Sequence, residues 1–191
     1  MTTKNIMIVG VGGQGTLLTS RILGKLAIHA NYDVKLSEVH GMAQRGGSVV
    51  TFVRYGAQVF SPTIEEGQAD VLIAFERLEA LRYLPFLKKD GVMIVNDQRI
   101  NPMTVMTGVA VYPENILDIL KETQPVVSIA AMEEAKKIGS PKSFNVVVLG
   151  AAAKYIGFSK EEWISVIRTT VPPKTVEKNL LAFETGYKIT I

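Results

Sequence analysis

Residues 7–28 read MIVGVGGQGTLLTSRILGKLAI and combine three patterns in one stretch. The opening residues form an apolar, β-branched run that is typical of a buried parallel strand. Gly10, Gly12 and Gly15 then give the spacing G-x-G-x-x-G. After the glycines, apolar residues recur at helical spacing. The stretch therefore predicts a strand, a tight turn and a helix, which together form the first unit of an α/β sheet.

The rest of the chain continues this alternation of short apolar runs and helical patterns. Further strands are predicted at 33–39, 48–55, 69–75, 92–96 and 108–113. Helices are predicted at 76–91 with an interruption at Pro85, at 114–122, 130–139 and 145–157, from 159 and after 173. The valine run at the start of 145–157 also fits a strand. No repeat or long linker divides the chain, so residues 1–191 are expected to form a single domain. The predicted fold is α/β: a Rossmann-like, mostly parallel sheet flanked by helices, with a helical C-terminal segment.

Composition excludes several classes of protein. The 191 residues are 47% hydrophobic and 20% charged, with a net charge of +3 that is scattered along the chain, so nucleic-acid binding is not expected. No run reaches the roughly 18 apolar residues of a membrane span, and no signal-type segment opens the chain, so the expected location is the cytoplasm. Cysteine is absent, which excludes disulfides, a thiolate nucleophile and cysteine-bound zinc or iron–sulfur clusters.

The glycine turn has the residues that a phosphate-binding loop needs. Gly10 would permit the tight turn, Gly12 a close approach of backbone N–H groups to a phosphate, and Gly15 the packing of the helix on the strand. Gly13 and Gln14 are unusual, because dinucleotide-binding enzymes often have small apolar residues there. Glu38, near the end of the second strand, could bind a ribose hydroxyl. Alternatively, the turn serves only to pack the strand against the helix.

A second candidate segment, SEVHGMAQRGGSV at 37–49, follows the second predicted strand. His40, Gln44 and Arg45 offer hydrogen-bond donors or acceptors, and Gly41, Gly46 and Gly47 permit close backbone approach or a positive φ. Arg45 suits a bidentate contact with phosphate or carboxylate, although it could equally form a structural salt bridge, and His40 could be an ordinary loop histidine. Neither a metal-ligand spacing nor a G-x-S-x-G elbow is present, so no catalytic or metal-binding residue is assigned.

Three stretches together are specific enough to indicate a family. GVGGQGTLLTSRILGKLA (10–27), SEVHGMAQRGGSV (37–49) and ADVLIAFERLEALRYLPFLKKDGVMIVN (69–96) closely resemble the gamma-type domain of the 2-oxoacid:ferredoxin oxidoreductases. Within that family, the resemblance is greatest to the members that act on indolepyruvate. The resemblance extends over nearly the whole chain, and its specific part is the combination of GGQG with HGMAQRGG.

This resemblance implies a non-catalytic subunit of an enzyme complex. Such complexes oxidatively decarboxylate an aryl pyruvate with coenzyme A to acyl-CoA, carbon dioxide and reduced ferredoxin. The resemblance places thiamine diphosphate, Mg²⁺ and the [4Fe-4S] clusters in a larger catalytic alpha subunit, with none of them bound by this chain. Made alone, the chain would expose an apolar patch and could self-associate as a homo-oligomer.

The candidate site residues are expected to converge on one face of the sheet. They are Gly10, Gly12, Gly13, Gln14, Gly15, Glu38, His40, Gln44, Arg45, Gly46 and Gly47. On that face they would either hold an anionic group such as a coenzyme A phosphate or dock the larger subunit. Two alternatives remain from the sequence: a free-standing oxidoreductase that binds NAD or FAD through the glycine loop and Glu38, and an interaction module without a ligand.

Overall fold

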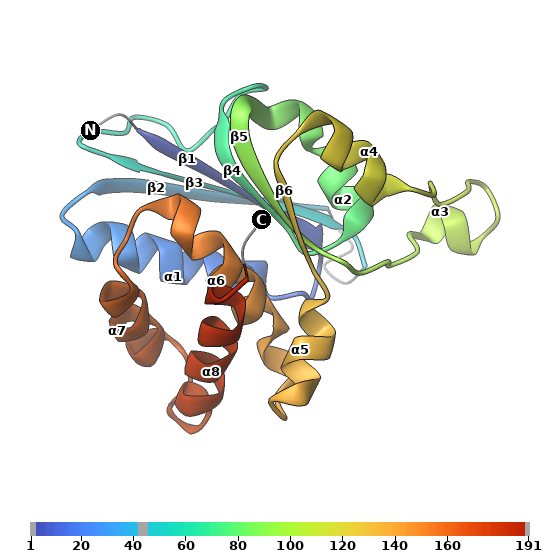
Figure 1. Ribbon diagram of the computed structural model, residues 1–191. Helices are drawn as coiled ribbons and strands as arrows, with labels where there is room; N and C mark the ends of the chain where they lie inside the picture. Colours follow the sequence, from blue (N-terminus) through green and yellow to red (C-terminus); the bar gives the residue numbers. More distant parts are fainter. Residues whose placement is uncertain (1–2, 42–45, 190–191) are drawn as a thin grey trace.

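The computed structural model describes residues 3–41 and 46–189 as one six-stranded sheet with helices on both faces (Figure 1). The strands are β1 (Lys4–Val11), β2 (Asp33–His40), β3 (Ser48–Gly56), β4 (Ala69–Ala74), β5 (Leu87–Asn96) and β6 (Val126–Ile129). The α-helices are α1 (Thr16–His29), α2 (Arg77–Arg82), α3 (Met103–Met106), α4 (Ile116–Thr123), α5 (Ala131–Lys137), α6 (Phe144–Ile156), α7 (Lys160–Thr170) and α8 (Val176–Tyr187). The mixed α/β class and the helical C-terminal segment are as predicted.

The strand order is β2-β3-β1-β4-β5-β6. β3 pairs antiparallel with both β1 and β2, whereas the β1–β4, β4–β5 and β5–β6 pairs are parallel. Only β3 therefore runs against the other strands, and the prediction of a mostly parallel sheet is confirmed. β3 also separates β1 from β2, so α1 leads from the first strand to a strand two positions away. In a dinucleotide-binding unit those two strands are neighbours.

Two apolar cores lie on the two faces of the sheet. Alternate residues of β1 separate them: Ile6 and Ile8 belong to the core under α1 and α5 to α8, while Met7 and Val9 belong to the core under α2 and α4. Because both faces of β1 are covered, its sequence is continuously apolar instead of alternating. Figure 1 shows the larger helical layer, with α1 and α5 to α8, on one side of the sheet and α2 with α4 on the other.

Two sequence predictions for the middle of the chain are wrong. The helix expected over 76–91 ends at Arg82, because Pro85 lies in a short 3-10 helix and β5 begins at Leu87. The strand expected at 108–113 does not form. The sixth strand is instead β6, a run of four residues that follows Pro125 and pairs parallel with β5.

The predictions for the C-terminal third are confirmed. Residues 144–156 form the buried helix α6, so their valine run is helical. The SKEE segment begins α7 with a capping box, in which the Ser159 hydroxyl accepts from the Glu162 N–H and the Glu162 carboxylate accepts from the Ser159 N–H. Helix α8 follows the two prolines at 172 and 173. In the part of the chain that is described, no helix combines the length and the apolar character needed to cross a bilayer.

Candidate functional site

The two glycine-bearing segments meet at the carboxyl edge of β1. Val11, at the end of β1, is paired with Ser48, at the start of β3. Directly beyond this pair, the N–H of Gly12 donates to the carbonyl oxygen of Gly47 at 2.9 Å. The sequence predicted that these two loops would be neighbours at the carboxyl ends of the strands, and the geometry brings them into direct contact.

The glycine turn needs glycine for two different reasons. Gly13 and Gly15 have φ angles of 101° and 89°, which is left-handed backbone that costs other residues free energy. A Cβ on Gly15 would also lie 2.4 Å from Nδ2 of Asn145, at the start of α6. Gly15 therefore lets the first turn of α1 lie directly against α6, whereas its predicted role was to let the helix pack on the strand.

The side chain of Gln14 points into the fold. It is 7% exposed, its Oε1 accepts from the N–H of Val11 at 2.7 Å, and its Nε2 donates to the carbonyl oxygen of Phe75 at 2.9 Å. A Cβ on Gly10 would lie 2.9 Å from this Oε1, so Gly10 makes room for the glutamine. Gly10 was predicted to permit the tight turn of the candidate loop, and Gln14 to contact an anionic group or the larger subunit. The structure instead uses the Gln14 amide to join the ends of β1 and β4.

Two polar residues that sequence analysis did not single out extend the hydrogen-bonded connection that Gln14 makes between β1 and β4. Asn96, at the end of β5, donates through Nδ2 to the Phe75 carbonyl at 3.0 Å and accepts from the N–H of Ala131 at 3.1 Å. Gln98 accepts from Gln14 Nε2 at 3.1 Å and from Asn96 Nδ2 at 3.0 Å. The ends of three parallel strands and the start of α5 are thus fixed by one amide network. An asparagine that ends an apolar strand is the only sequence signal for it.

The second loop is described at its two ends. His40 ends β2, Gly41 follows it, and Gly46 and Gly47 precede β3. Gly46 has a φ of 81°, so a glycine is favoured there as predicted. Gln44 and Arg45 lie outside the described residues, and their assigned roles stay predictions.

A hollow of about 360 Å³ lies between the glycine turn and the end of β2. Its lining comprises Gly12, Gly13, Gly15, Thr16, Leu17, Glu38, His40 and Val49. Five of the predicted residues therefore share one hollow, although they come from segments more than twenty positions apart. Thr16, Leu17 and Val49 were not predicted, and the position of the first two in the opening turn of α1 is the signal that could have found them.

The polar groups of this hollow are of two kinds. The first N–H groups of α1 have no partner within the helix, and its first turn carries no acidic residue. Opposite them, the Glu38 carboxylate accepts from the Thr51 hydroxyl at 3.1 Å and lies 3.8 Å from Nδ1 of His40. The helix end suits an anionic group, and Glu38 suits a hydroxyl, so the hollow can bind a ligand that carries both.

A smaller hollow of about 130 Å³ lies on the opposite side of Gly46 and Gly47. Its wall includes two buried carboxylates, Glu76 and Glu79, which are 1% and 4% exposed. Glu79 accepts a short hydrogen bond from the Ser48 hydroxyl and a second one from Arg82 Nε at 3.3 Å. The end of the second loop is therefore held by Gly12 on one side and by α2 on the other.

The donor atoms of the chain do not suit a metal centre. Cysteine is absent from the sequence, and within residues 3–41 and 46–189 no three His, Asp or Glu residues lie close enough to share a metal ion. The hollow at the glycine turn instead presents backbone amides and a few polar side chains.

Comparison with known proteins assigns the family. The profile described as pyruvate ferredoxin/flavodoxin oxidoreductase matches residues 5–189. The chain belongs to this family. Among its relatives is a protein of Thermococcus kodakarensis named indolepyruvate oxidoreductase subunit IorB, which is 43% identical over 98% of this chain and 96% of its own. The resemblance drawn from the sequence motifs is thereby confirmed.

Members of the pyruvate ferredoxin/flavodoxin oxidoreductase family also share the fold. The crystal structure of the gamma subunit of a keto/oxoacid ferredoxin oxidoreductase from Geobacter sulfurreducens matches with a TM-score of 0.71 and 26% identity, over 97% of this chain and 96% of the other. Another relative is ketoisovalerate oxidoreductase subunit VorA of Methanothermobacter marburgensis. It is 26% identical over 95% of this chain, which covers only 35% of VorA. In VorA the equivalent of this chain is therefore one part of a longer polypeptide.

Proposed function

We propose that this chain is the non-catalytic subunit of a thiamine diphosphate-dependent 2-oxoacid:ferredoxin oxidoreductase, with residues 1–191 forming one domain. The reaction is the oxidative decarboxylation of an aryl pyruvate with coenzyme A to acyl-CoA, carbon dioxide and reduced ferredoxin. The 43% identity to a subunit named for indolepyruvate supports this substrate class. The proposed location is the cytoplasm, and the proposed partners are a larger alpha subunit and, through the complex, ferredoxin.

The chemistry of the residues supports a location of the redox groups in the larger subunit. Iron–sulfur clusters are held by cysteine thiolates, and this chain has no cysteine. Mg²⁺ that binds thiamine diphosphate needs oxygen ligands grouped around it, and the described residues offer no cluster of three acidic or histidine side chains. The contribution of this chain is therefore to bind and orient, and no bond-making step is assigned to its residues.

The 360 Å³ hollow supports a binding role for the two glycine loops. Its volume lies in the range of small-molecule sites. The first turn of α1, whose N–H groups have no partner within the helix, lines it and carries no acidic residue. We assign to it an anionic part of coenzyme A, such as a phosphate. Gly12, Gly13 and Gly15 would offer backbone to that group, while Glu38 and His40 would bind hydroxyl or amide groups of the same ligand.

Leu17→Glu tests this assignment within the assembled enzyme. Leu17 lines the hollow and is 51% exposed, so a carboxylate there adds repulsion toward a phosphate without disturbing the core. Leu181→Glu, at a 47% exposed position of α8, is the matched control. Each variant is co-expressed with the larger subunit, and reduction of a viologen dye is measured with indolepyruvate against rising coenzyme A.

We expect the KM for coenzyme A to rise at least tenfold in Leu17→Glu, with the amount of assembled complex unchanged and the control at the wild-type value. An unchanged KM would remove coenzyme A from the hollow. Loss of assembly in Leu17→Glu alone would assign the loops to docking of the larger subunit. A wild-type complex that reduces the dye with pyruvate or 2-oxoglutarate but not with indolepyruvate would correct the substrate class.

A further inference from the structure

Residues 101–111, here called the arm, expose more large apolar side chains than any comparable stretch of the described chain. Met103, Met106, Val109 and Val111 are 67%, 69%, 79% and 88% exposed, and they account for four of the eleven exposed large hydrophobic residues. Figure 1 shows the arm, which contains α3, projecting from the body of the molecule beyond α2 and α4. Apolar patches of this kind on a protein surface mark interaction sites.

The arm has its own internal structure. The N–H groups of Val109 and Ala110 both donate to the carbonyl oxygen of Thr104, at 2.9 and 3.0 Å. At the same time Val105 packs against the core under α2 and α4. One side of the arm is therefore seated on the body, and the opposite side chains are held outward. A preformed element of this kind loses less conformational entropy when it binds.

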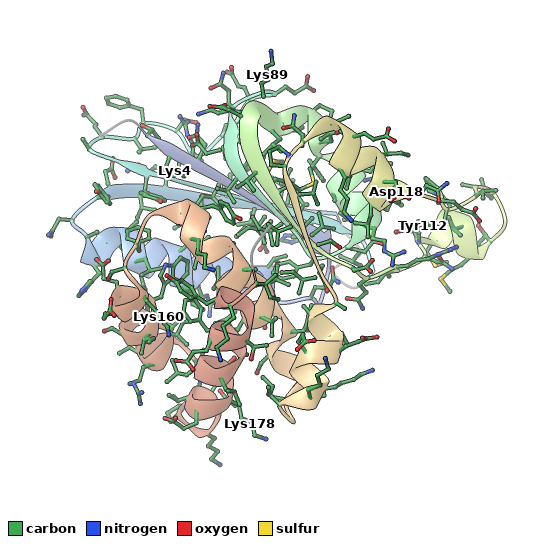
Figure 2. All side chains as sticks on the ribbon, in the orientation of Figure 1. Lys4, Lys89, Tyr112, Asp118, Lys160 and Lys178 are labelled. Atoms are coloured by element: carbon green, nitrogen blue, oxygen red, sulfur yellow. The ribbon has the colours of Figure 1, made fainter. Side chains whose placement is uncertain are left out.

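The base of the arm is fixed by a buried carboxylate. The Tyr112 hydroxyl donates to Glu76 Oε1 at 2.5 Å, and the N–H of Ile100 donates to the same oxygen at 3.0 Å. Glu76 thus binds both ends of the arm at one point, and Arg99 stacks over the Tyr112 ring at 4.3 Å. Figure 2 shows Tyr112 between α3 and α4, where the chain returns to the body.

The arm carries no charge. Arg99 and Glu114 flank a stretch of fourteen residues, 100–113, that contains no Asp, Glu, Lys or Arg. The fully buried centre of a protein interface is depleted in charged residues and enriched in methionine and aromatic residues, and permanent interfaces are the most apolar. The chemistry of the arm therefore fits a permanent protein partner with an apolar groove.

We propose that the arm anchors this chain to the larger subunit, an inference that rests on the proposed function. Ile100 and Pro102, at the start of the arm, share the 130 Å³ hollow with Gly46 and Gly47, so the arm continues the same edge of the sheet as the two glycine loops. In VorA the equivalent of this chain covers 35% of one longer polypeptide. Where the parts are separate chains, a permanent apolar contact must replace that covalent link.

A second copy of this chain fits the arm less well. A projecting element needs a groove, and a hollow of about 460 Å³ lies between α1 and β2, on the side of the sheet away from β5 and β6. Docking of the arm of one copy into this hollow of another would be head-to-tail, a contact that extends into filaments unless it closes into a ring. Arg21 and Lys25 also line that hollow, whereas the arm offers them no carboxylate.

The test uses the double variant Val109→Glu with Val111→Glu, co-expressed with an affinity-tagged larger subunit. Phe60→Glu is the control. Phe60 is 85% exposed but follows β3, whose last residues pair with the start of β1, at the end of the strands away from the arm. A milder pair, Met103→Ser with Met106→Ser, guards against a folding defect, and circular dichroism with thermal melting of each free chain checks the fold. We expect recovery of the double variant on the tagged subunit to fall at least tenfold, that of the milder pair at least threefold, and that of the control not at all.

The recovery measurements separate a failure of the proposed function from a failure of the arm inference. If the wild-type chain is not recovered on the larger subunit, the proposed function fails. If the wild type is recovered and both arm variants are recovered equally well, only the arm inference is overturned. It is also overturned if the control is lost to the same extent, or if the arm variants merely convert a dimer of the free chain into a monomer while recovery on the larger subunit is unchanged.

Discussion

Gln14 and the arm invert the usual distribution of polar and apolar residues. A glutamine in a surface turn is 7% exposed, whereas Val111, in a segment of the same edge, is 88% exposed. Both Gln14 amide atoms are hydrogen-bonded inside the fold, at distances of 2.7 to 3.1 Å. Val111 directly follows Val109 and Ala110, whose N–H groups donate to the Thr104 carbonyl oxygen, and its side chain is in water.

This difference shows that the available hydrogen-bond partners and the packing of each segment against the core, not polarity alone, decide which side chains are buried. A polar group can be buried when its partners are in place, and an apolar group stays exposed when the backbone holds it away from the core. The first situation strengthens the fold, because the amide closes the sheet beneath the glycine turn. The second contributes nothing to the free chain and indicates a partner.

The largest effect is expected from Gln14→Met, which keeps the length of the side chain but removes its three hydrogen bonds, to Val11, Phe75 and Gln98. The buried N–H of Val11 then has no side-chain acceptor, which costs about 2–3 kcal/mol of the free energy of unfolding. Leu17→Met, at an exposed position three residues further on, is the control and should change stability by less than about 0.5 kcal/mol. Urea unfolding measures both, and equal stability of the two variants would contradict the bracing role of Gln14.

A smaller loss is expected from Tyr112→Phe at the base of the arm. Burial, and then the hydrogen bond to Glu76, raise the pKa of the Tyr112 hydroxyl, so it stays protonated and donates throughout the usual pH range. Removing it leaves Glu76 with its two backbone donors, the N–H groups of Ile100 and Glu79, and should cost about 1–2 kcal/mol.

Tyr83→Phe, at a partly buried position after α2, controls for the loss of a hydroxyl as such. The arm inference adds a second expectation for Tyr112→Phe, because a looser base should weaken recovery on the larger subunit more than Tyr83→Phe does. Wild-type stability of Tyr112→Phe would show that Glu76 does not fix the arm.

The parts of the fold that could be predicted from the sequence depend on neighbours in the chain. The strand, glycine turn and α1 were predicted because all the necessary signals lie within residues 7–28. The capping box of Ser159 and Glu162 depends on residues three positions apart. The continuous apolar run of α6 indicated a buried helix, and ten of its thirteen residues are buried.

The parts that could not be predicted depend on residues far apart in the sequence. Gln14 was recognised as unusual, but its inward direction is set by Phe75, 61 positions away. The insertion of β3 between β1 and β2 follows from long-range pairing that no local pattern reports. β6 has only four residues and pairs with β5, whereas the apolar residues at 108–113 imitate a strand although Val109 and Val111 are 79% and 88% exposed.

The capping box of α7 offers the same kind of side-chain to backbone bond as Gln14, but in an exposed place. The hydrogen bond from the Ser159 N–H lowers the pKa of the Glu162 carboxyl below its ordinary value. The folded state therefore binds this proton less readily than the unfolded state does. The resulting stabilisation is present above the ordinary pKa, near 4.5, and is lost as the pH falls through the lower folded value.

Glu162→Gln should accordingly lose about 0.5 kcal/mol at pH 7 and show a smaller difference from the wild type at pH 3.5. Glu161→Gln, at the neighbouring glutamate outside the capping box, is the control. Thermal melting at the two pH values measures the effect. A stability difference between Glu162→Gln and the wild type that grows on acidification would contradict a lowered pKa of Glu162 in the folded state.

The smallest effect is expected from Val111→Ser, which tests the other half of the comparison. Val111 is 88% exposed, so its apolar surface is already in water in the free chain, and the substitution should change the free energy of unfolding by less than about 0.5 kcal/mol. Urea unfolding of the dilute free chain measures this. A loss above 1 kcal/mol would mean that the free chain itself buries Val111, and the contrast with Gln14 would then no longer indicate a partner. If Val111→Ser leaves the free energy of unfolding of the free chain unchanged but weakens recovery on the larger subunit, Val111 contributes to assembly and not to the stability of the free chain.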